Sequence, residues 1–181
     1  ACHGYGQLAE PFLGFLAPAM VPGRVVIAPE ALSRFYLDSG TGRVGASWMT
    51  REARSREIDD YVTFLDAVRD AVLGDYTSAA TLILGFSQGA ATAFRWAVRM
   101  STPPSRLVLW AGGVPPDEDA DTVRAALAET AIILVTGEAD KYATPAAIRE
   151  DAERLTGLGL NVRVELFDGG HRLDKETFAR I

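Results

Sequence analysis

Apolar residues gather in five short runs along the chain. These runs are residues 24–29, 81–86, 106–112, 131–137 and 161–167. The first four are almost continuously apolar, which is typical of strands that are covered on both faces of a parallel sheet. The last run alternates, with Val162, Val164 and Leu166 on one side, and this pattern favours an edge or half-exposed strand.

Helical patterns separate these runs. Between residues 58 and 73, apolar residues recur at spacings of three and four, as on one face of an amphipathic helix. Thr144 and Pro145 are typical of the N-cap and the first residue of another helix. Helices are also predicted from Leu8 onward and over 88–100, 117–129, 144–159 and 173–181. The alternation predicts one α/β domain over residues 1–181, with a mostly parallel sheet and helices on both faces.

Residues 30–53 carry the least regular pattern and are too long for a plain connection. They follow the first predicted strand, at the carboxyl edge where parallel sheets bind ligands. We expect this segment to form one wall of a substrate pocket, with Trp48 as its main contact. The side chains predicted to line the pocket are Phe35, Tyr36, Trp48, Met49, Trp110 and Tyr142. The alternative is that they fill the core, as aromatic residues usually do.

The composition argues against several classes of partner. The formal net charge is −6 over 181 residues, whereas nucleic-acid and anionic-membrane partners require a basic face. No apolar run approaches the ~20 residues of a membrane-spanning helix. The single cysteine cannot form an internal disulfide, and the sequence has no Cys/His cluster for zinc. We therefore expect a cytoplasmic protein that binds no metal. The sequence starts at Ala1 without an initiator methionine, so we expect the N-terminus to be trimmed.

The sequence GFSQG places Ser87 between two glycines, after the apolar run 81–86 and before an Ala-rich helix. A nucleophile elbow requires this strand–turn–helix context, in which a sharp turn strains the backbone of the serine. Gly85 and Gly89 leave room where side chains would clash across the turn. Ser87 is therefore the candidate nucleophile. The alternative is that Ser87 only caps the helix that follows.

A serine hydroxyl needs a general base, and a base histidine needs a carboxylate to orient it. Of the two histidines, His171 follows the last predicted strand and lies at the same sheet edge as Ser87. Asp140, in the loop after residues 131–137, is the preferred partner of His171. The alternative for His171 is an ordinary solvated loop residue. The competing acids are Glu138 and Asp168.

Backbone N–H groups are needed to stabilise the negative charge of a tetrahedral intermediate. The N–H of Gln88 lies at a helix N-terminus directly after Ser87. A second N–H is expected from Tyr5, in the early loop ACHGYGQ that precedes an apolar helix. His3 in this loop is interpreted as a hydrogen-bonded structural residue that orders the loop, rather than as a second base.

The motifs HGYG, GFSQG, GEAD and GGH together resemble the phospholipase/carboxylesterase branch of the α/β-hydrolases, which includes the acyl-protein thioesterases. The resemblance covers essentially the whole chain and implies a minimal α/β-hydrolase fold that needs no metal or organic cofactor. It implies Ser87 as nucleophile, Asp140 and His171 as its partners, and the N–H groups of Tyr5 and Gln88 as oxyanion donors. The chain departs from the family in residues 30–53, in lacking the strands before HGYG, and in ending soon after His171.

We therefore expect a serine carboxylesterase that hydrolyses small or medium acyl esters through an acyl-enzyme, with a small-molecule ester as its partner. A thioesterase or lysophospholipase would use the same catalytic groups. A non-catalytic ligand-binding protein is a further alternative, because a fold does not determine function. Ligand binding, however, requires none of the catalytic groups.

Overall fold

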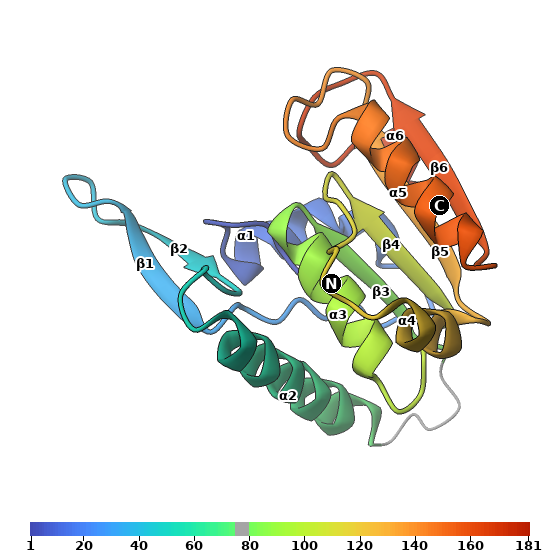
Figure 1. The fold of residues 1–181 in the computed structure, drawn as a ribbon. Helices are drawn as coiled ribbons and strands as arrows, with labels where there is room; N and C mark the ends of the chain where they lie inside the picture. Colours follow the sequence, from blue (N-terminus) through green and yellow to red (C-terminus); the bar gives the residue numbers. More distant parts are fainter. Residues whose placement is uncertain (75–79) are drawn as a thin grey trace.

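The computed structural model describes residues 1–74 and 80–181. Within them, β3 (Leu82–Phe86), β4 (Arg106–Trp110), β5 (Ala131–Gly137) and β6 (Val162–Phe167) form a four-stranded parallel sheet in the order β3-β4-β5-β6. These strands confirm the four predicted runs from residue 81 onward. β6 lies at an edge of the sheet, as its alternating pattern predicts. Because parallel strands end at the same edge, the loops that follow β3, β5 and β6 meet there (Figure 1).

Helices cover both faces of this sheet (Figure 1). They are α1 (Ala9–Phe15), α2 (Arg54–Leu73), α3 (Gln88–Arg99), α4 (Ala120–Leu127), α5 (Pro145–Gly157) and α6 (Lys175–Phe178), with a 3₁₀ helix η1 (Ala17–Ala19). Leu107 and Leu109 of β4 pack with α2–α5, whereas Val108 and Trp110 pack with α1 and α6. Successive side chains of a strand point to opposite faces, so each strand contributes to both cores. Thr144 caps α5 as predicted, since its side chain accepts the N–H of Ala147.

The run 24–29 does not form a strand, so that prediction is wrong. The amino group of Ala1 donates to the carbonyl oxygen of Ile27 (2.7 Å), and Cys2 forms an isolated bridge with Gly85 of β3. A strand requires successive ladder bonds, and among the described residues the contact with Ala1 supplies only this one. Val25 is 64% exposed as a result.

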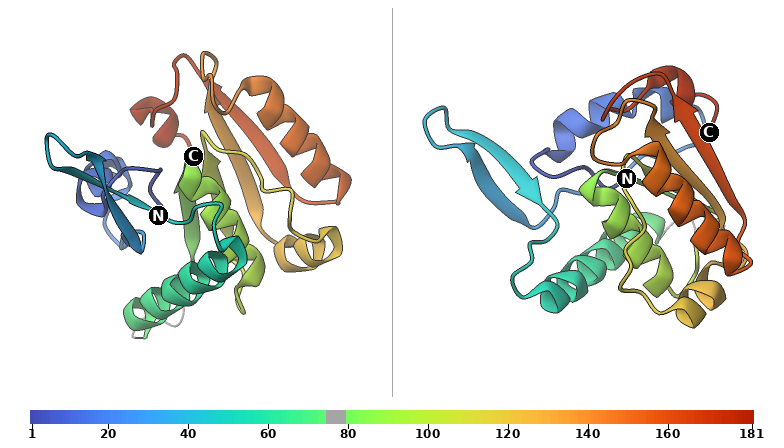
Figure 2. Two further views of the ribbon diagram at one scale, coloured as in Figure 1. Left: turned by 60° about the vertical axis from the view of Figure 1, so that its left-hand side comes forward. Right: turned by 45° about the horizontal axis from the view of Figure 1, so that its top comes forward.

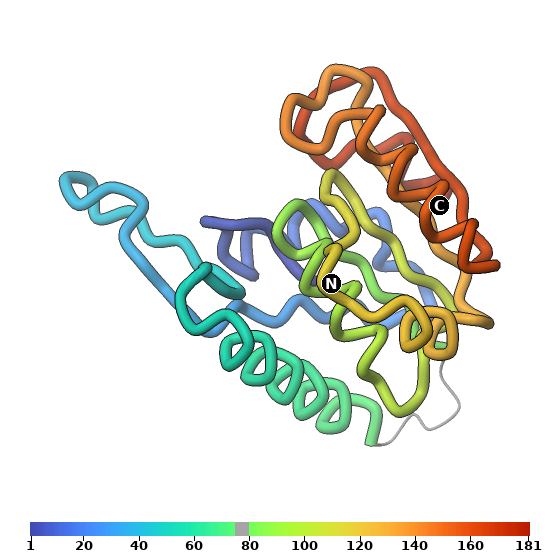
Figure 3. Tube along the Cα trace, viewed as in Figure 1, coloured from blue at the N-terminus to red at the C-terminus, as the bar shows by residue number. Residues whose placement is uncertain are grey.

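Residues 30–53 are more regular than predicted. They contain an antiparallel hairpin of β1 (Ser33–Asp38) and β2 (Arg43–Ser47), which projects from the body of the molecule (Figures 1 and 2). The aromatic pair Phe35–Tyr36 favours a strand. Gly42, at φ +68°, allows a tight turn between the strands. The trace in Figure 3 shows this hairpin standing at one end of the molecule, connected by extended residues to the body.

Candidate active site

Ser87 occupies a sharp turn between β3 and α3. Its φ of 54° and ψ of −118° lie in a region that residues other than glycine rarely adopt, at a cost of about 1–3 kcal/mol. A Cβ at Gly85 would lie 2.1 Å from the carbonyl oxygen of Gly89, and a Cβ at Gly89 would lie 2.2 Å from that of Cys2. Both glycines therefore permit the close packing that the turn requires. Within the described residues, the Ser87 side chain makes no capping hydrogen bond to α3, which argues against the cap alternative.

Ser87, His171 and Asp140 form one hydrogen-bonded chain across the carboxyl edge of the sheet. The Oγ of Ser87 lies 2.9 Å from Nε2 of His171, and Nδ1 of His171 lies 2.8 Å from Oδ2 of Asp140. An ionised carboxylate only accepts hydrogen bonds, so Nδ1 carries the proton and donates to Asp140. Nε2 is then free to accept the hydroxyl proton of Ser87. The structure brings together the three residues expected from the sequence.

Asp140 is held rigidly in this arrangement. The residue is 3% exposed, and its Oδ1 accepts the backbone N–H groups of Tyr142 (2.8 Å) and Ala143 (3.0 Å). The competing acids Glu138 and Asp168 are exposed, and neither is hydrogen-bonded to His171 in the described part of the chain. Asp140 is thus the acid that the fold directs at His171.

The two expected oxyanion donors belong to segments that adjoin Ser87. A Cβ added to Gly4 would lie 3.2 Å from Cβ of Ser87, so the loop that carries Tyr5 runs directly beside the serine. The N–H of Gly4 donates to the side chain of Gln7 and is therefore occupied. Across residues 1–74 and 80–181, the N–H groups of Tyr5 and Gln88 have no hydrogen-bond acceptor. They are thus available to a developing oxyanion.

His3 has the structural role that the sequence predicts. It is fully buried, with Nδ1 2.8 Å from the carbonyl oxygen of Gly4 and Nε2 accepting the N–H of Ala31 at 3.0 Å. Both ring nitrogens are therefore engaged, and Nδ1 carries the proton. Burial lowers the pKa of His3, which favours the neutral ring. His3 thus orders the loop and has no free lone pair to act as a base.

Two of the predicted pocket residues are core residues instead. Trp48 is 2% exposed and Trp110 is fully buried, so neither offers a surface to a substrate. The indole Nε1–H of Trp48 donates to the carbonyl oxygen of His3 (2.8 Å), and that of Trp110 donates to the carbonyl oxygen of Arg172 (2.9 Å). Buried indoles need such partners, and here the partners lie in the loops that carry Tyr5 and His171. The core alternative therefore holds for both tryptophans.

The remaining predicted pocket residues lie nearer the surface. Tyr142 is 85% exposed, and its ring centroid lies 5.0 Å from that of His171. Phe35 lies 5.0 Å from the ring of Tyr5, and Met49 is half-buried. Tyr36 is 69% exposed on the hairpin. Contact of these side chains with a substrate stays a prediction.

These observations can be compared with known proteins. A family model described as Phospholipase/Carboxylesterase matches residues 2–181. The chain belongs to the phospholipase/carboxylesterase family. The resemblance inferred from HGYG, GFSQG, GEAD and GGH is thereby confirmed, and it places the chain among esterase- and thioesterase-type hydrolases. A comparison with curated protein sequences found no match.

Solved structures of related shape support the fold assignment for this family member. SOBER1 of Arabidopsis thaliana matches with a TM-score of 0.76 and 17% identity, over 99% of this chain and 92% of that one. Esterase PE8 matches at 0.73 and 19%, over 99% and 86%. Acyl-protein thioesterase 2 of Zea mays matches at 0.67 and 19%, over 97% and 86%. The predicted α/β-hydrolase fold is therefore confirmed.

Among residues 1–74 and 80–181, no group of three or more His, Cys, Asp or Glu side chains is arranged to hold a metal ion. In the same residues, no helix is both long and apolar enough to cross a bilayer.

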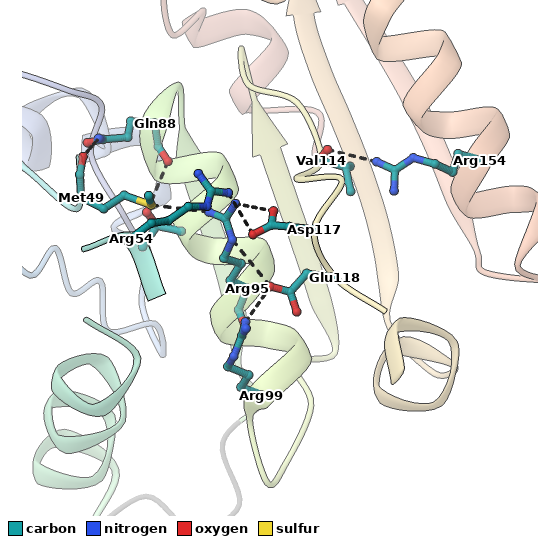
Figure 4. A network of polar contacts seen from close by, with 10 residues as sticks. Met49, Arg54, Gln88, Arg95, Arg99, Val114, Asp117, Glu118 and Arg154 are labelled. Atoms are coloured by element: carbon teal, nitrogen blue, oxygen red, sulfur yellow. Dashed lines mark hydrogen bonds and ion pairs between the residues drawn. The ribbon is translucent and has the colours of Figure 1, made fainter. Parts of the chain in front are cut away.

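An ionic network around Arg95 was not predicted from the sequence. Arg95 of α3 is 3% exposed, and it pairs with Asp117 (2.7 Å) and approaches Glu118 (3.6 Å) in the loop that leads from β4 to α4 (Figure 4). A third contact joins Arg95 Nη1 to the sulfur of Met49 (3.8 Å). Arg95 is charged, so the hydrophobic pattern of the sequence does not indicate that it is buried. Its burial depends on acidic partners that are distant in the sequence.

We expect Arg95→Met to lower the free energy of unfolding by about 2 kcal/mol, because it removes the buried arginine that pairs with Asp117 and Glu118. Asp117 then keeps Arg54 as its partner, and Glu118 keeps Arg99. Arg54→Met is the matched control, since Arg54 pairs with the same Asp117 (2.9 Å) from a side chain that is 41% exposed. That change should cost about 1 kcal/mol or less. Urea unfolding measures both, and equal losses would contradict the importance of burial at Arg95.

The ion pair between Arg95 and Asp117 predicts that the stability of the fold depends on pH. Desolvation works to raise the pKa of Asp117, but hydrogen bonds from Arg95 and Arg54 outweigh it and hold the pKa well below its usual range. A depressed pKa stabilises the fold above the unfolded-state pKa of about 3.9, and this contribution is lost as pH falls through the lower, folded-state pKa. The stability gap between wild type and Arg95→Met should therefore narrow below about pH 4. A gap that is constant from pH 7 to pH 3 would contradict this assignment.

Proposed function

We propose that this protein is a serine carboxylesterase that hydrolyses small or medium acyl esters through an acyl-enzyme. The observation that carries the proposal is the hydrogen-bonded chain from Ser87 through His171 to Asp140 at the carboxyl edge of the sheet. A strained serine that makes no helix cap among the described residues, beside a histidine with a fixed tautomer, suits nucleophilic catalysis better than ligand binding.

In the first half-reaction, Oγ of Ser87 attacks the ester carbonyl carbon while Nε2 of His171 takes the hydroxyl proton. The N–H groups of Tyr5 and Gln88 stabilise the oxyanion of the tetrahedral intermediate. The carbon–oxygen bond to the alcohol then breaks, and His171 returns the proton to the leaving alkoxide. Water repeats these steps on the acyl-enzyme, releasing the acid and restoring Ser87. Asp140 keeps the proton on Nδ1 and stabilises the imidazolium.

The size of a hollow next to the Tyr5 loop supports short acyl groups. A hollow of about 210 Å³ lies between α1 and the hairpin, and it is lined by Gly6, Leu8, Phe12, Leu37 and Val44 among others. Gly6 adjoins the proposed donor Tyr5, so a chain leaving the reacting carbonyl could enter this mostly apolar space. Sites for drug-sized ligands usually measure about 300–1,000 Å³, which is larger.

The proposal is tested with nitrophenyl esters from acetate to decanoate, measured with wild type and Ser87→Ala. We expect turnover to be highest for short and medium chains and to vanish in Ser87→Ala. A fluorophosphonate should add one equivalent to the wild type, at Ser87 in the peptide map. Labelling at another residue, or full turnover by Ser87→Ala, would show that the nucleophile is wrong.

A thioesterase would share every catalytic group, so substrate comparison decides between them. The structural likeness to an acyl-protein thioesterase of Zea mays motivates including acyl thioesters of the same chain lengths. Higher kcat/KM for thioesters would favour that alternative, and a preference for lysophospholipids would favour a lysophospholipase. A folded wild type that turns over none of them and resists the fluorophosphonate would indicate a ligand-binding protein.

A further inference from the structure

Each of the three tryptophans has its indole N–H bonded to another segment of the chain. Trp96 of α3 donates to the carboxylate of Asp66 on α2 (2.9 Å), which joins two helices away from the loops of the candidate site. Trp48 donates to the carbonyl oxygen of His3 (2.8 Å), in the loop that presents the N–H of Tyr5. Trp48 lies just after the hairpin, at the end of a segment that touches this loop in several places.

The segment 45–48 holds the Tyr5 loop from one side. The N–H of Gly6 donates to the carbonyl oxygen of Ala46 (2.9 Å). A Cβ added to Gly45 would lie 2.5 Å from the carbonyl oxygen of Gly6, so the two backbones touch. The rings of Trp48 and His3 lie 5.2 Å apart, in addition to the hydrogen bond from the indole. The position of the Tyr5 N–H is thus set by residues on both sides of it.

The same segment is attached to the helix that starts beside Ser87. The side-chain oxygen of Gln88 accepts the backbone N–H of Trp48 (3.1 Å). Its side-chain nitrogen donates to Oγ of Ser47 (3.0 Å) and to the carbonyl oxygen of Met49 (2.8 Å), and Figure 4 shows Gln88 facing Met49. Gln88, whose backbone N–H is one proposed oxyanion donor, therefore binds this segment through its side chain. The same segment contacts the loop that carries the other proposed donor, the N–H of Tyr5.

We propose that Trp48 is a positioning residue that fixes the Tyr5 N–H relative to the Gln88 N–H and so sets the spacing of the oxyanion hole. The inference rests on the proposed esterase function. The path runs from the Gln88 side chain to the backbone of Trp48, then through the indole N–H to His3, two residues before Tyr5. Oxyanion stabilisation depends on donors held at 2.7–3.1 Å from the charge, so a small displacement of one donor weakens it.

The test is Trp48→Phe, which keeps an aromatic ring in the core and removes the indole N–H. We expect kcat for nitrophenyl butyrate to fall about 10-fold, less than the ~10²–10³-fold that deletion of a donor costs. KM should stay within about twofold, because the lost interaction forms mainly in the transition state. The inhibition constant of butylboronic acid, which forms a tetrahedral adduct with an active serine, should rise by about the same factor as kcat falls.

Trp96→Phe is the matched control, since it removes an indole N–H bond of similar length from another buried tryptophan. It should lower the melting temperature but leave kcat, KM and the boronate inhibition constant within about twofold of wild type. If Trp48→Phe does not fold, Gln88→Met provides the second variant, because it releases residues 47–49 and keeps the backbone N–H of Gln88. It should show the same split between kcat and KM.

Two results would overturn the inference. One is a Trp48→Phe enzyme (or, in its place, Gln88→Met) with kcat and boronate affinity within about twofold of wild type. The other is an equal loss in Trp96→Phe, which would indicate a general effect of lost stability. Ser87→Ala, assayed in parallel, separates this failure from failure of the proposed function. Full turnover by Ser87→Ala would reject the function, whereas an inactive Ser87→Ala beside an unaffected Trp48→Phe would reject only the role of Trp48.

Discussion

His171→Ala is expected to lower kcat for nitrophenyl esters by about 10⁴-fold or more, which is the scale of loss when the base of a serine triad is removed. The physical reason is the 2.9 Å contact between Nε2 of His171 and Oγ of Ser87, because a serine hydroxyl without an acceptor for its proton is a poor nucleophile. The residual rate would come from substrate binding and the oxyanion donors. Initial rates at known concentrations of folded protein measure this loss.

The control for this prediction is His3→Ala. His3 is fully buried, and its two nitrogens contact the backbone at Gly4 and Ala31, so its removal disturbs the loop rather than a proton transfer. We expect a lower melting temperature and a smaller loss of kcat than for His171→Ala. If His3→Ala were the more damaging change in folded protein, the assignment of the base would be reversed.

Asp140→Asn is expected to lower kcat by about 10⁴-fold while the fold is retained. The two backbone N–H groups of Tyr142 and Ala143 donate to Oδ1, so the asparagine would keep its oxygen there and turn its NH₂ group toward His171. An NH₂ group donates to Nδ1, which forces the proton onto Nε2. His171 would then face Ser87 with a donor instead of an acceptor.

Glu138→Gln provides the comparison, because Glu138 lies in the same loop but is exposed. Its activity should stay near that of wild type. Thermal melts of both variants check that any loss is chemical and not due to unfolding. A larger loss of activity in Glu138→Gln than in Asp140→Asn, at equal stability, would mean that the acid is wrongly assigned.

The proximity of the site residues can be predicted from the sequence, because it depends on the order and direction of the strands. Ser87, Asp140 and His171 each come shortly after a short apolar run, and parallel strands end at one edge whatever the details of packing. The sequence therefore predicts their proximity, and the structure shows it. Their catalytic role stays a prediction. The sequence favours Asp140 over Glu138 as the partner of His171, and the structure adds a physical difference, because both follow β5 and only Asp140 is buried.

Other features depend on partners that a local pattern does not contain. The run 24–29 has the composition of a strand, but a strand needs a neighbour, and Ala1 supplies a single bond among the described residues. Trp48 and Trp110 are aromatic residues of the kind that line pockets. Each is buried instead, and donates its indole N–H to a loop carbonyl distant in the sequence. The sequence does contain a hairpin pattern, since Phe35–Tyr36 and the residues of β2 flank a turn that contains glycine.

The candidate site depends on contacts between residues that are far apart in the sequence. Its hydrogen bonds join residues 84 positions apart at Ser87–His171, 31 apart at Asp140–His171 and 45 apart at His3–Trp48. Contacts at such separations form slowly, because the entropy of closing long loops is lost before they stabilise anything. A fragment must span at least residues 3–171 to contain all of these groups. Recovery of activity after denaturation therefore reports completion of the whole tertiary structure, whereas recovery of helical signal reports only its local parts.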